Sequence, residues 1–255
     1  CVEFLNYVVE MFNKKGWSLD ASVGYAQKNN LFSTDEMVCT KTLYNYVDLG
    51  ILPIKNIDLP EKLKRNTKSS STRKNRKILG KSIEERTETV NLREEFGHWE
   101  IDSVLGKKKD TEPAIMTIVE RKTRMSLWIK IKDHSSMAID EALQSLINRF
   151  GTKKSEVFKS ITGDNGSEFA NLSNIENNGI SVYFTHPYTS CEKGTNECHN
   201  KMLRRFIPKG KSIDDYSAED ILFFSDTING LPRKILNYHT PEELFDNQLD
   251  RIYAT

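Results

Sequence analysis

Three acidic residues have surroundings that could support chemistry at a metal ion. Asp102 interrupts an otherwise apolar run, Asp164 follows a second run in ITGDNGSEFA, and Glu197 lies in the first turn of an expected helix. Transfer of a phosphodiester commonly uses two divalent ions about 3.5–4 Å apart, and Mg²⁺ prefers carboxylate oxygens. The three carboxylates suit this chemistry if the fold brings them together.

Each acid also has a simpler explanation. Asp102 could be a solvated residue on an outer strand face, Asp164 could serve only the turn in which it lies, and Glu197 could only complement a helix dipole. Other acids compete for the same role. They are Glu100, Glu168 and Glu192.

The elements that would position these acids follow from the apolar spacing after residue 96. Residues 98–106, 114–120 and 125–131 alternate as three strands, and their short connections predict antiparallel pairing. A helix over 136–150, a strand ending at 162, a strand over 180–184 and helices over 194–207 and 217–229 follow. This order predicts an α/β mixed sheet covered by helices, which is the order of the ribonuclease H-like fold. There the first and fourth strands are neighbours and the helix after the fifth strand crosses them, so the three acids could meet.

Residues 1–61 form a separate helical region. Three short helices are predicted, the first ended by Gly16, the second capped by Ser18 and the third leaving Lys41 on a polar outer face. The pattern is compatible with a helix-turn-helix that binds DNA. It fits an ordinary small helical bundle equally well.

A basic linker is expected over 62–95, between the helical region and a catalytic core over 96–255. Residues 62–81 carry nine Lys/Arg and no acid, although the whole chain has a net charge of only +1. Such a segment can neutralise DNA phosphates, or it can be a solvated linker with no partner. The basic side chains that we expect to contact DNA here are Arg73, Lys74, Arg76 and Lys77.

Composition excludes several classes of protein. Hydrophobic residues make up 37% of the chain, which is enough for a core, and no run approaches the roughly 20 apolar residues of a membrane span. Four cysteines do not form a disulfide framework, so a reducing cytoplasm is expected. The start carries no signal peptide pattern, and it begins with Cys1 rather than Met, which suggests an N-terminally truncated chain.

Several segments together resemble one family. They are HWEIDSVLGKK, ERKTR, ITGDNGSEFA, VYFTHPYTSCEKGTNECHNKMLRRFIPKG and LPRKILNYHTPEELF. They are similar to the catalytic core of bacterial insertion-sequence transposases of the IS-thirty family, closely over 96–246 and loosely over 16–66. The resemblance implies an aspartate–aspartate–glutamate metal triad at Asp102, Asp164 and Glu197.

The same resemblance implies contacts around the triad. Arg204 follows Glu197 by two helical turns and would contact a DNA phosphate, as would Lys201. Support from behind the metal ligands is expected from Asn165, Gly166 and Asn200. The chain departs from the family at Cys191 and at Cys198-His199, outside the triad. Zinc is disfavoured, because no standard ligand spacing relates these residues to one another or to His186.

The implied activity is DNA transposition: cleavage at the ends of an insertion sequence, then strand transfer into target DNA. The implied cofactors are two Mg²⁺ ions per site, with Mn²⁺ substituting. The implied partners are double-stranded DNA, at terminal inverted repeats and target, and further copies of the chain, in the bacterial cytoplasm at the nucleoid and with no membrane. Two alternatives stay open. One is a truncated, non-catalytic DNA-binding remnant that represses, and the other is a nuclease of the same fold.

Overall fold

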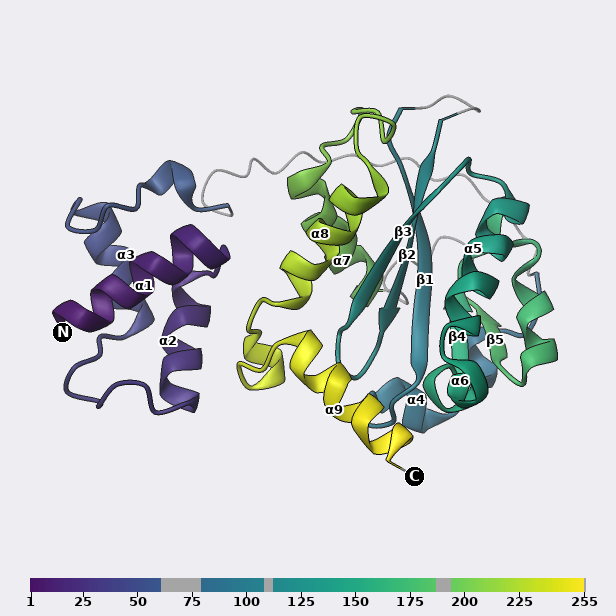
Figure 1. Ribbon diagram of the computed structural model, residues 1–255, viewed down its shortest axis with the longest axis horizontal. Coiled ribbons are helices and arrows are strands. Elements are labelled where there is room, and N and C mark those ends of the chain that lie inside the picture. Colours follow the sequence, from purple (N-terminus) through teal and green to yellow (C-terminus); the bar gives the residue numbers. More distant parts are fainter. Residues whose placement is uncertain (61–78, 108–111, 187–193, 255) are drawn as a thin grey trace. The chain divides into compact units, whose positions relative to one another are not determined.

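The protein consists of two compact units. The computed structural model describes residues 1–60, 79–107, 112–186 and 194–254. The first unit, here the helical unit, is Cys1–Ser71 with Gly230–Glu243, and the second, the core unit, is Thr72–Asn229 with Leu244–Thr255 (Figure 1). Within the described ranges, no helix has the length and hydropathy needed to span a bilayer.

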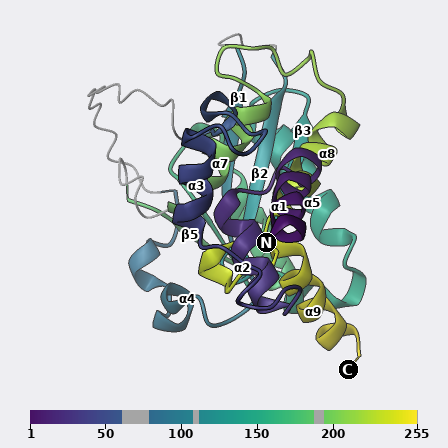
Figure 2. The same cartoon turned by 90° about the vertical axis from the view of Figure 1, so that its left-hand side faces the viewer.

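The helical unit contains the three helices that the sequence predicts. They are α1 (Val2–Lys15), α2 (Leu19–Lys28) and α3 (Thr40–Asp48), followed by a 3₁₀ turn η1 (Asn56–Asp58) (Figure 2). Gly16 ends α1 with a left-handed φ of 66°, and Ser18 caps α2 by accepting a hydrogen bond from the Ala21 amide. Phe4, Leu19 and Leu43 are fully buried between these helices.

A segment from near the end of the chain completes the helical unit. Residues 230–243 contain the 3₁₀ turn η7 (Lys234–Leu236) and pack on α2. The Tyr238 ring lies so close to Gly24 that a Cβ on this glycine would be 2.1 Å from ring atoms. The Tyr238 hydroxyl donates to Asp20 at 3.3 Å, and Lys28 Nζ lies 2.6 Å from His239 Nδ1.

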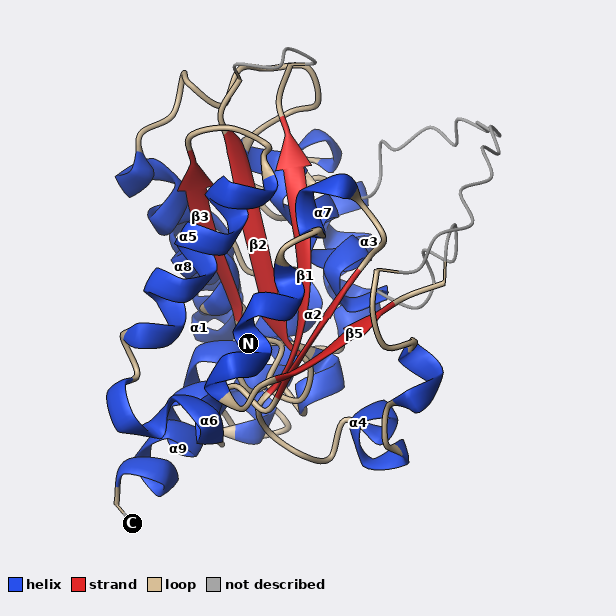
Figure 3. Ribbon diagram, turned by 90° about the vertical axis from the view of Figure 1, so that its right-hand side faces the viewer, coloured by secondary structure: helices blue, strands red, loops and turns tan. Residues whose placement is uncertain are grey.

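The core unit is built on a five-stranded mixed sheet with the order β3-β2-β1-β4-β5 (Figure 3). Strand β2 pairs antiparallel with β1 and β3, whereas β1, β4 and β5 run parallel. The strands are β1 (His98–Leu105), β2 (Ala114–Glu120), β3 (Ser126–Ile131), β4 (Ser160–Gly163) and β5 (Ser181–Phe184). This is the ribonuclease H-like arrangement, as predicted.

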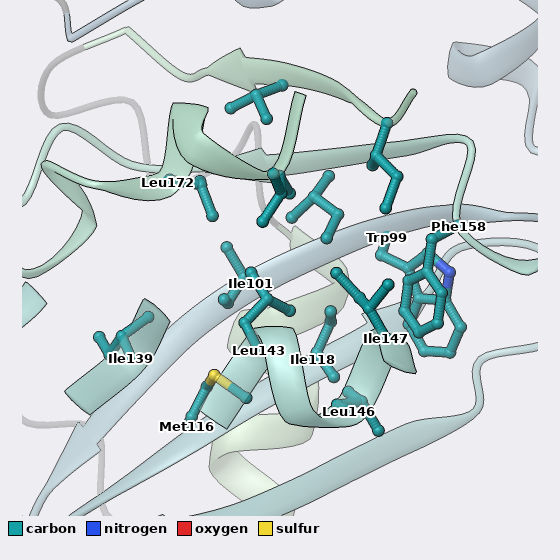
Figure 4. Packing of buried hydrophobic residues seen from close by; sticks show 14 of the residues in the cluster. Trp99, Ile101, Met116, Ile118, Ile139, Leu143, Leu146, Ile147, Phe158 and Leu172 are labelled. Carbon is teal, nitrogen blue, oxygen red and sulfur yellow. The ribbon is translucent and has the colours of Figure 1, made fainter. Parts of the chain in front are cut away.

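Helices cover both faces of this sheet. One face carries α5 (Ser136–Asn148), and the other carries α7 (Gly194–Phe206) and α8 (Ala218–Asn229) (Figure 1). On the α5 face, Ile139, Leu143 and Ile147 pack on apolar side chains of the sheet such as Ile101, and the Trp99 and Phe158 rings stack at 4.8 Å between centroids (Figure 4). Because Trp99 and Ile101 face α5, side-chain alternation directs Glu100 and Asp102 to the α7 face.

Seven further helical elements complete the described part of the chain outside the helices and turns named above. They are η2 (Ile83–Glu85), α4 (Glu88–Leu92), η3 (Gly151–Lys153), α6 (Lys154–Val157), η4 (Ser167–Phe169), η5 (Leu172–Asn178) and α9 (Pro241–Tyr253). The described part of the expected linker, 79–95, includes η2 and α4 and contacts the sheet, since the Arg86 guanidinium donates to Thr162 at 3.3 Å. Helix α9 starts with a capping box, in which Thr240 and Glu243 exchange side-chain-to-backbone hydrogen bonds.

Candidate active site

The two candidate aspartates lie on or next to two neighbouring parallel strands. Asp102 is inside β1 and Asp164 directly follows β4, and the pairing of these strands runs from His98↔Ser160 to Glu100↔Thr162, two residues before both aspartates. Both side chains are partly buried. The charges of both aspartates also act on His134, whose pKa is raised first by its hydrogen bond to Glu168. Asp102 and Asp164 therefore lie at the same edge of the sheet.

Helix α7 runs alongside β1 and contacts it at three points. The backbone N–H of Asn196 donates to Glu100 Oε2 at 3.2 Å. The Asn200 side chain donates to Asp102 Oδ2 at 2.7 Å, and Arg204 Nη2 donates to the Leu105 carbonyl at 2.8 Å. The contacts advance along both elements together, since each turn of α7 meets a later part of β1.

Glu197 lies one turn before Asn200 on α7, between the first two contacts with β1. The helix begins at Gly194, so Thr195 and Asn196 belong to its first turn, and both are buried. Over the described part of the chain, no three His, Cys, Asp or Glu side chains are grouped closely enough to hold a metal ion. Glu197 is thus on the helix whose next turn bonds to Asp102, and the metal triad stays a prediction.

The Asp102 carboxylate is oriented by neutral side chains. Asn200 donates to it, and Thr117 Oγ1 on β2 lies 3.3 Å from Asn200 Oδ1, to which it donates. This second contact turns the amide so that its nitrogen faces the carboxylate. Sequence reasoning named Asn200 as a supporting residue but missed Thr117, whose strand partner is Asp102 itself.

The turn after β4 is shaped by its own polar groups. Asp164 Oδ1 accepts a hydrogen bond from the Gly166 amide at 3.0 Å. Asn165 accepts from the Leu79 amide at 3.0 Å and donates to the Thr185 carbonyl. A Cβ at Gly166 would be 2.3 Å from the Glu168 carboxylate, so a side chain there would have to displace that carboxylate. The turn thereby holds Asp164 and brings Glu168 back toward the sheet.

The competing acids have different surroundings. Glu100 is fully buried, forms an ion pair with Arg121 and accepts the Asn196 amide, so its carboxylate is used within the fold. Glu168 accepts from Ser103 at 3.2 Å and lies 3.3 Å from His134 Nε2. Burial by itself would raise the pKa of Glu168, but the contacts with His134 and Ser103 and a backbone amide bring it below its usual value. Glu192 lies outside the described residues.

The expected DNA-contacting side chains differ in their surroundings. Lys41 on α3 and Lys201 on α7 are exposed. Arg204 is only partly exposed and burial lowers its pKa, which distinguishes it from an ordinary surface arginine. The basic residues Arg73, Lys74, Arg76 and Lys77 lie outside the described ranges, as do Lys108 and Cys191.

The cysteine and histidine residues that the structure describes near the site differ in burial and in partners. Cys198 is exposed, whereas His199 is buried, with its two ring nitrogens next to the Thr195 and Arg124 carbonyls at 2.8 and 3.1 Å. His98 is buried between Ser160 and Glu95. These histidines have partners within the fold.

Comparison with known proteins gives one consistent result. Residues 93–190 match the integrase core domain family, whose enzymes generally use divalent metal ions. A probable transposase of the insertion-like sequence element IS1161 from Streptococcus salivarius is 44% identical over 207 residues, covering 81% of this chain and 58% of that protein. Transposase InsI of element IS30A from Escherichia coli is 32% identical over 170 residues, covering 66% and 43%.

A solved structure is also similar. The catalytic core domain of BIV integrase matches with a TM-score of 0.46 and 19% identity, covering 62% of this chain and 98% of that one. The chain spans about half the length of the transposases that it matches, from 43% to 58% for the two named above. With its integrase core match and these relatives, the chain belongs to the IS30 family of insertion-sequence transposases.

Proposed function

We propose that this chain is a DDE transposase, which cleaves DNA at the ends of an insertion sequence and joins those ends to target DNA. The observation that supports the proposal is the position of Asp102 in β1 and of Asp164 directly after the neighbouring parallel strand β4, with α7, which carries Glu197, bonded to Asp102 through Asn200. Membership of the transposase family supports the same reaction.

The side chains at this edge of the sheet fit a hard divalent cation. The proposed ligands, Asp102, Asp164 and Glu197, offer only carboxylate oxygens, which Mg²⁺ and Mn²⁺ accept. Asn200 holds one oxygen of Asp102 in place, which is the usual contribution of a residue behind a metal ligand. We infer a two-ion site that Asp102, Asp164 and Glu197 would hold. When bound, such ions stabilise the charge that develops during phosphodiester transfer.

The remaining residues would bind and orient DNA. Water attacks a phosphodiester at the element end and releases a 3′-hydroxyl, which then attacks a phosphodiester of target DNA. No covalent link to the protein is needed. Lys201, Arg204 and Lys41, with the basic segment around Arg73–Lys77, would neutralise phosphates. Two element ends must be joined in one event, so a homo-oligomer acting at the bacterial nucleoid is proposed.

Replacing one proposed metal ligand tests this function. Asp164→Ala should abolish Mg²⁺-dependent nicking and strand transfer of element-end DNA while leaving the gel-shift affinity for that DNA nearly unchanged. Asp214→Asn is the matched control, because its side chain is 73% exposed and pairs only at 3.6 Å with Lys130. Nicking by Asp164→Ala in Mg²⁺ at the wild-type rate would refute the assignment.

The same assays separate the two other readings. Tight binding of element-end DNA by the wild-type chain, with no nicking under any divalent ion, would identify a non-catalytic repressor. Nicked product without any joined product would identify a plain nuclease. We expect joined product in both Mg²⁺ and Mn²⁺.

A further inference from the structure

A second polar cluster lies beside the two aspartates and has no part in the proposed reaction. Ser103 Oγ is 2.7 Å from His134 Nε2 and donates to Glu168 Oε1 at 3.2 Å, and the same His134 nitrogen is 3.3 Å from Glu168 Oε1. The three side chains therefore contact one another in pairs. They come from β1, from the connection between β3 and α5, and from η4.

The position of this cluster in the sheet is informative. Backbone pairing between β1 and β4 ends at Glu100↔Thr162, two residues before Asp102 and Asp164. Beyond that point no strand ladder fixes one aspartate relative to the other. Ser103 directly follows Asp102, and Glu168 lies in the turn that follows Asp164. The hydrogen bond from Ser103 to Glu168 thus connects the two segments where the ladder has stopped.

The charges within the cluster are matched. The His134 side chain is 29% exposed and that of Glu168 is 15% exposed. The pKa of His134 is raised by Glu168 and by the two aspartates, and that of Glu168 is lowered overall. The 3.3 Å contact with His134 gives this third carboxylate a partner next to Asp102 and Asp164. The basic type of His134 and the acidic type of Glu168 therefore suit their contact with each other.

We propose that Ser103, His134 and Glu168 form a positioning cluster that sets the separation of Asp102 and Asp164 for divalent-ion binding. The inference rests on the proposed function, because it assumes that the two aspartates hold the ions. Residues behind metal ligands typically change metal affinity about 10–100-fold when removed. His134 and Glu168 act here through the aspartates and are not catalytic residues.

The test compares ion binding and folding in one set of variants of the full chain. Ser103→Ala removes the hydroxyl donor, His134→Ala removes the imidazole and its contacts with Ser103 and Glu168, and Glu168→Gln keeps the shape of the side chain. Lys132→Ala is the control, since it removes an exposed ion pair with Glu141 from the same connection without touching the cluster. Free Mn²⁺ is titrated by electron paramagnetic resonance, with DNA absent, and thermal unfolding is followed by circular dichroism.

We expect the Mn²⁺ dissociation constant to rise about tenfold or more in Ser103→Ala and His134→Ala. His134→Gln, which keeps a donor for Glu168 or Ser103, should recover part of the affinity. Lys132→Ala should match the wild type. The Mg²⁺ concentration for half-maximal nicking should rise in parallel, while the rate at saturating Mg²⁺ falls less.

The outcomes are distinguishable. If all three cluster variants fold and bind Mn²⁺ like Lys132→Ala, the positioning role is wrong although the proposed function stands. If they lose stability but keep Mn²⁺ affinity, the cluster only stabilises the fold, and the inference is again wrong. If Ser103→Ala or His134→Ala fails to fold, the Mn²⁺ affinity of the near-isosteric Glu168→Gln decides. An affinity equal to that of Lys132→Ala would then refute the positioning role. If the wild-type chain itself binds no Mn²⁺, the proposed metal site fails.

Discussion

At the scale of single residues, the surroundings of α7 separate side chains that look alike in the sequence. Lys201 is exposed, whereas Arg204 is partly buried and donates to the Leu105 carbonyl. Its Nη1 atom is buried without a hydrogen-bond partner among the described residues. A guanidinium pinned in this way serves the contact between α7 and β1, and any phosphate contact it makes must come second.

This difference predicts how the two substitutions change DNA binding. Lys201→Ala should weaken binding uniformly and reduce the slope of log K against log salt by about 1, as expected for one lost phosphate contact. Arg204→Ala should also lower thermal stability, since it removes the bond to Leu105. Salt titrations of element-end affinity, read beside melting curves, check both. An unchanged slope for Lys201→Ala would remove it from the DNA-binding surface.

A pH prediction concerns Glu95, at the end of the core unit that holds the start of β1. Hydrogen bonds from Lys159 at 2.6 Å and His98 at 3.0 Å lower the pKa of Glu95 to about 2. A carboxyl with a lowered pKa in the folded state stabilises the fold above its ordinary pKa of 4.5, and this contribution is lost as the pH falls toward 2.

Glu95→Gln should therefore be less stable than the wild type at pH 7, and the difference should shrink below about pH 4.5. Urea unfolding between pH 3 and 7 measures it. Glu156→Gln, which removes a partly exposed pair with Lys153, is the control. A wild-type advantage that stayed constant down to pH 3 would show that the lowered pKa is not present in solution.

At the scale of elements, sequence periodicity predicted most of the scaffold and few of the side-chain partnerships. The α5 stripe, the alternation in β1 and the caps at Ser18 and Thr240 are local signals, so they could be found without a structure. Register is set by pairing between distant segments. The Ser103–His134–Glu168 contacts join three such segments, and no spacing in the sequence marks them.

For the candidate site too, the sequence predicts some features and not others. The sequence locates Asp102 inside an alternating strand and Asp164 directly after a strand end. It does not give their separation, because the ladder between β1 and β4 stops two residues before both. The burial of Glu100 with Arg121 follows from packing and not from the sequence pattern, because a lone acid in a strand has the same appearance whether exposed or paired. The roles of the triad remain predictions for mutagenesis.

Helix α2 offers a prediction with an unusual sign. Gly24 lies inside the helix, where replacing Gly by Ala ordinarily stabilises by up to about 1 kcal/mol. Here the added Cβ would be 2.1 Å from the Tyr238 ring. Gly24→Ala should instead destabilise the helical unit by about 1–3 kcal/mol through overpacking. Chemical denaturation of Gly24→Ala, Tyr238→Ala and the double variant measures it, and additive effects would show that the two residues are not in contact.

At the scale of the whole molecule, segments far apart in the chain belong to the same compact unit. Residues 230–243 group with the N-terminal helices, while Leu244 onward groups with the sheet, where Phe245 packs on Trp99 with ring centroids 5.9 Å apart. The motif containing Tyr238 and His239 was recognised from the sequence as part of the family pattern, but its assignment to the helical unit required contacts such as those to Asp20 and Lys28.

Hydrogen exchange should reveal these two units as separate blocks of stability. Leu43→Ala creates a cavity in the helical unit, at a cost of about 2–5 kcal/mol. It should speed exchange of backbone amides in both 1–60 and 233–239, because those segments form one unit. Ile139→Ala, in the core unit, should speed exchange in the sheet and leave 233–239 protected. Faster exchange of 233–239 in Ile139→Ala but not in Leu43→Ala would contradict the division, because backbone amides exchange when the unit that contains them unfolds.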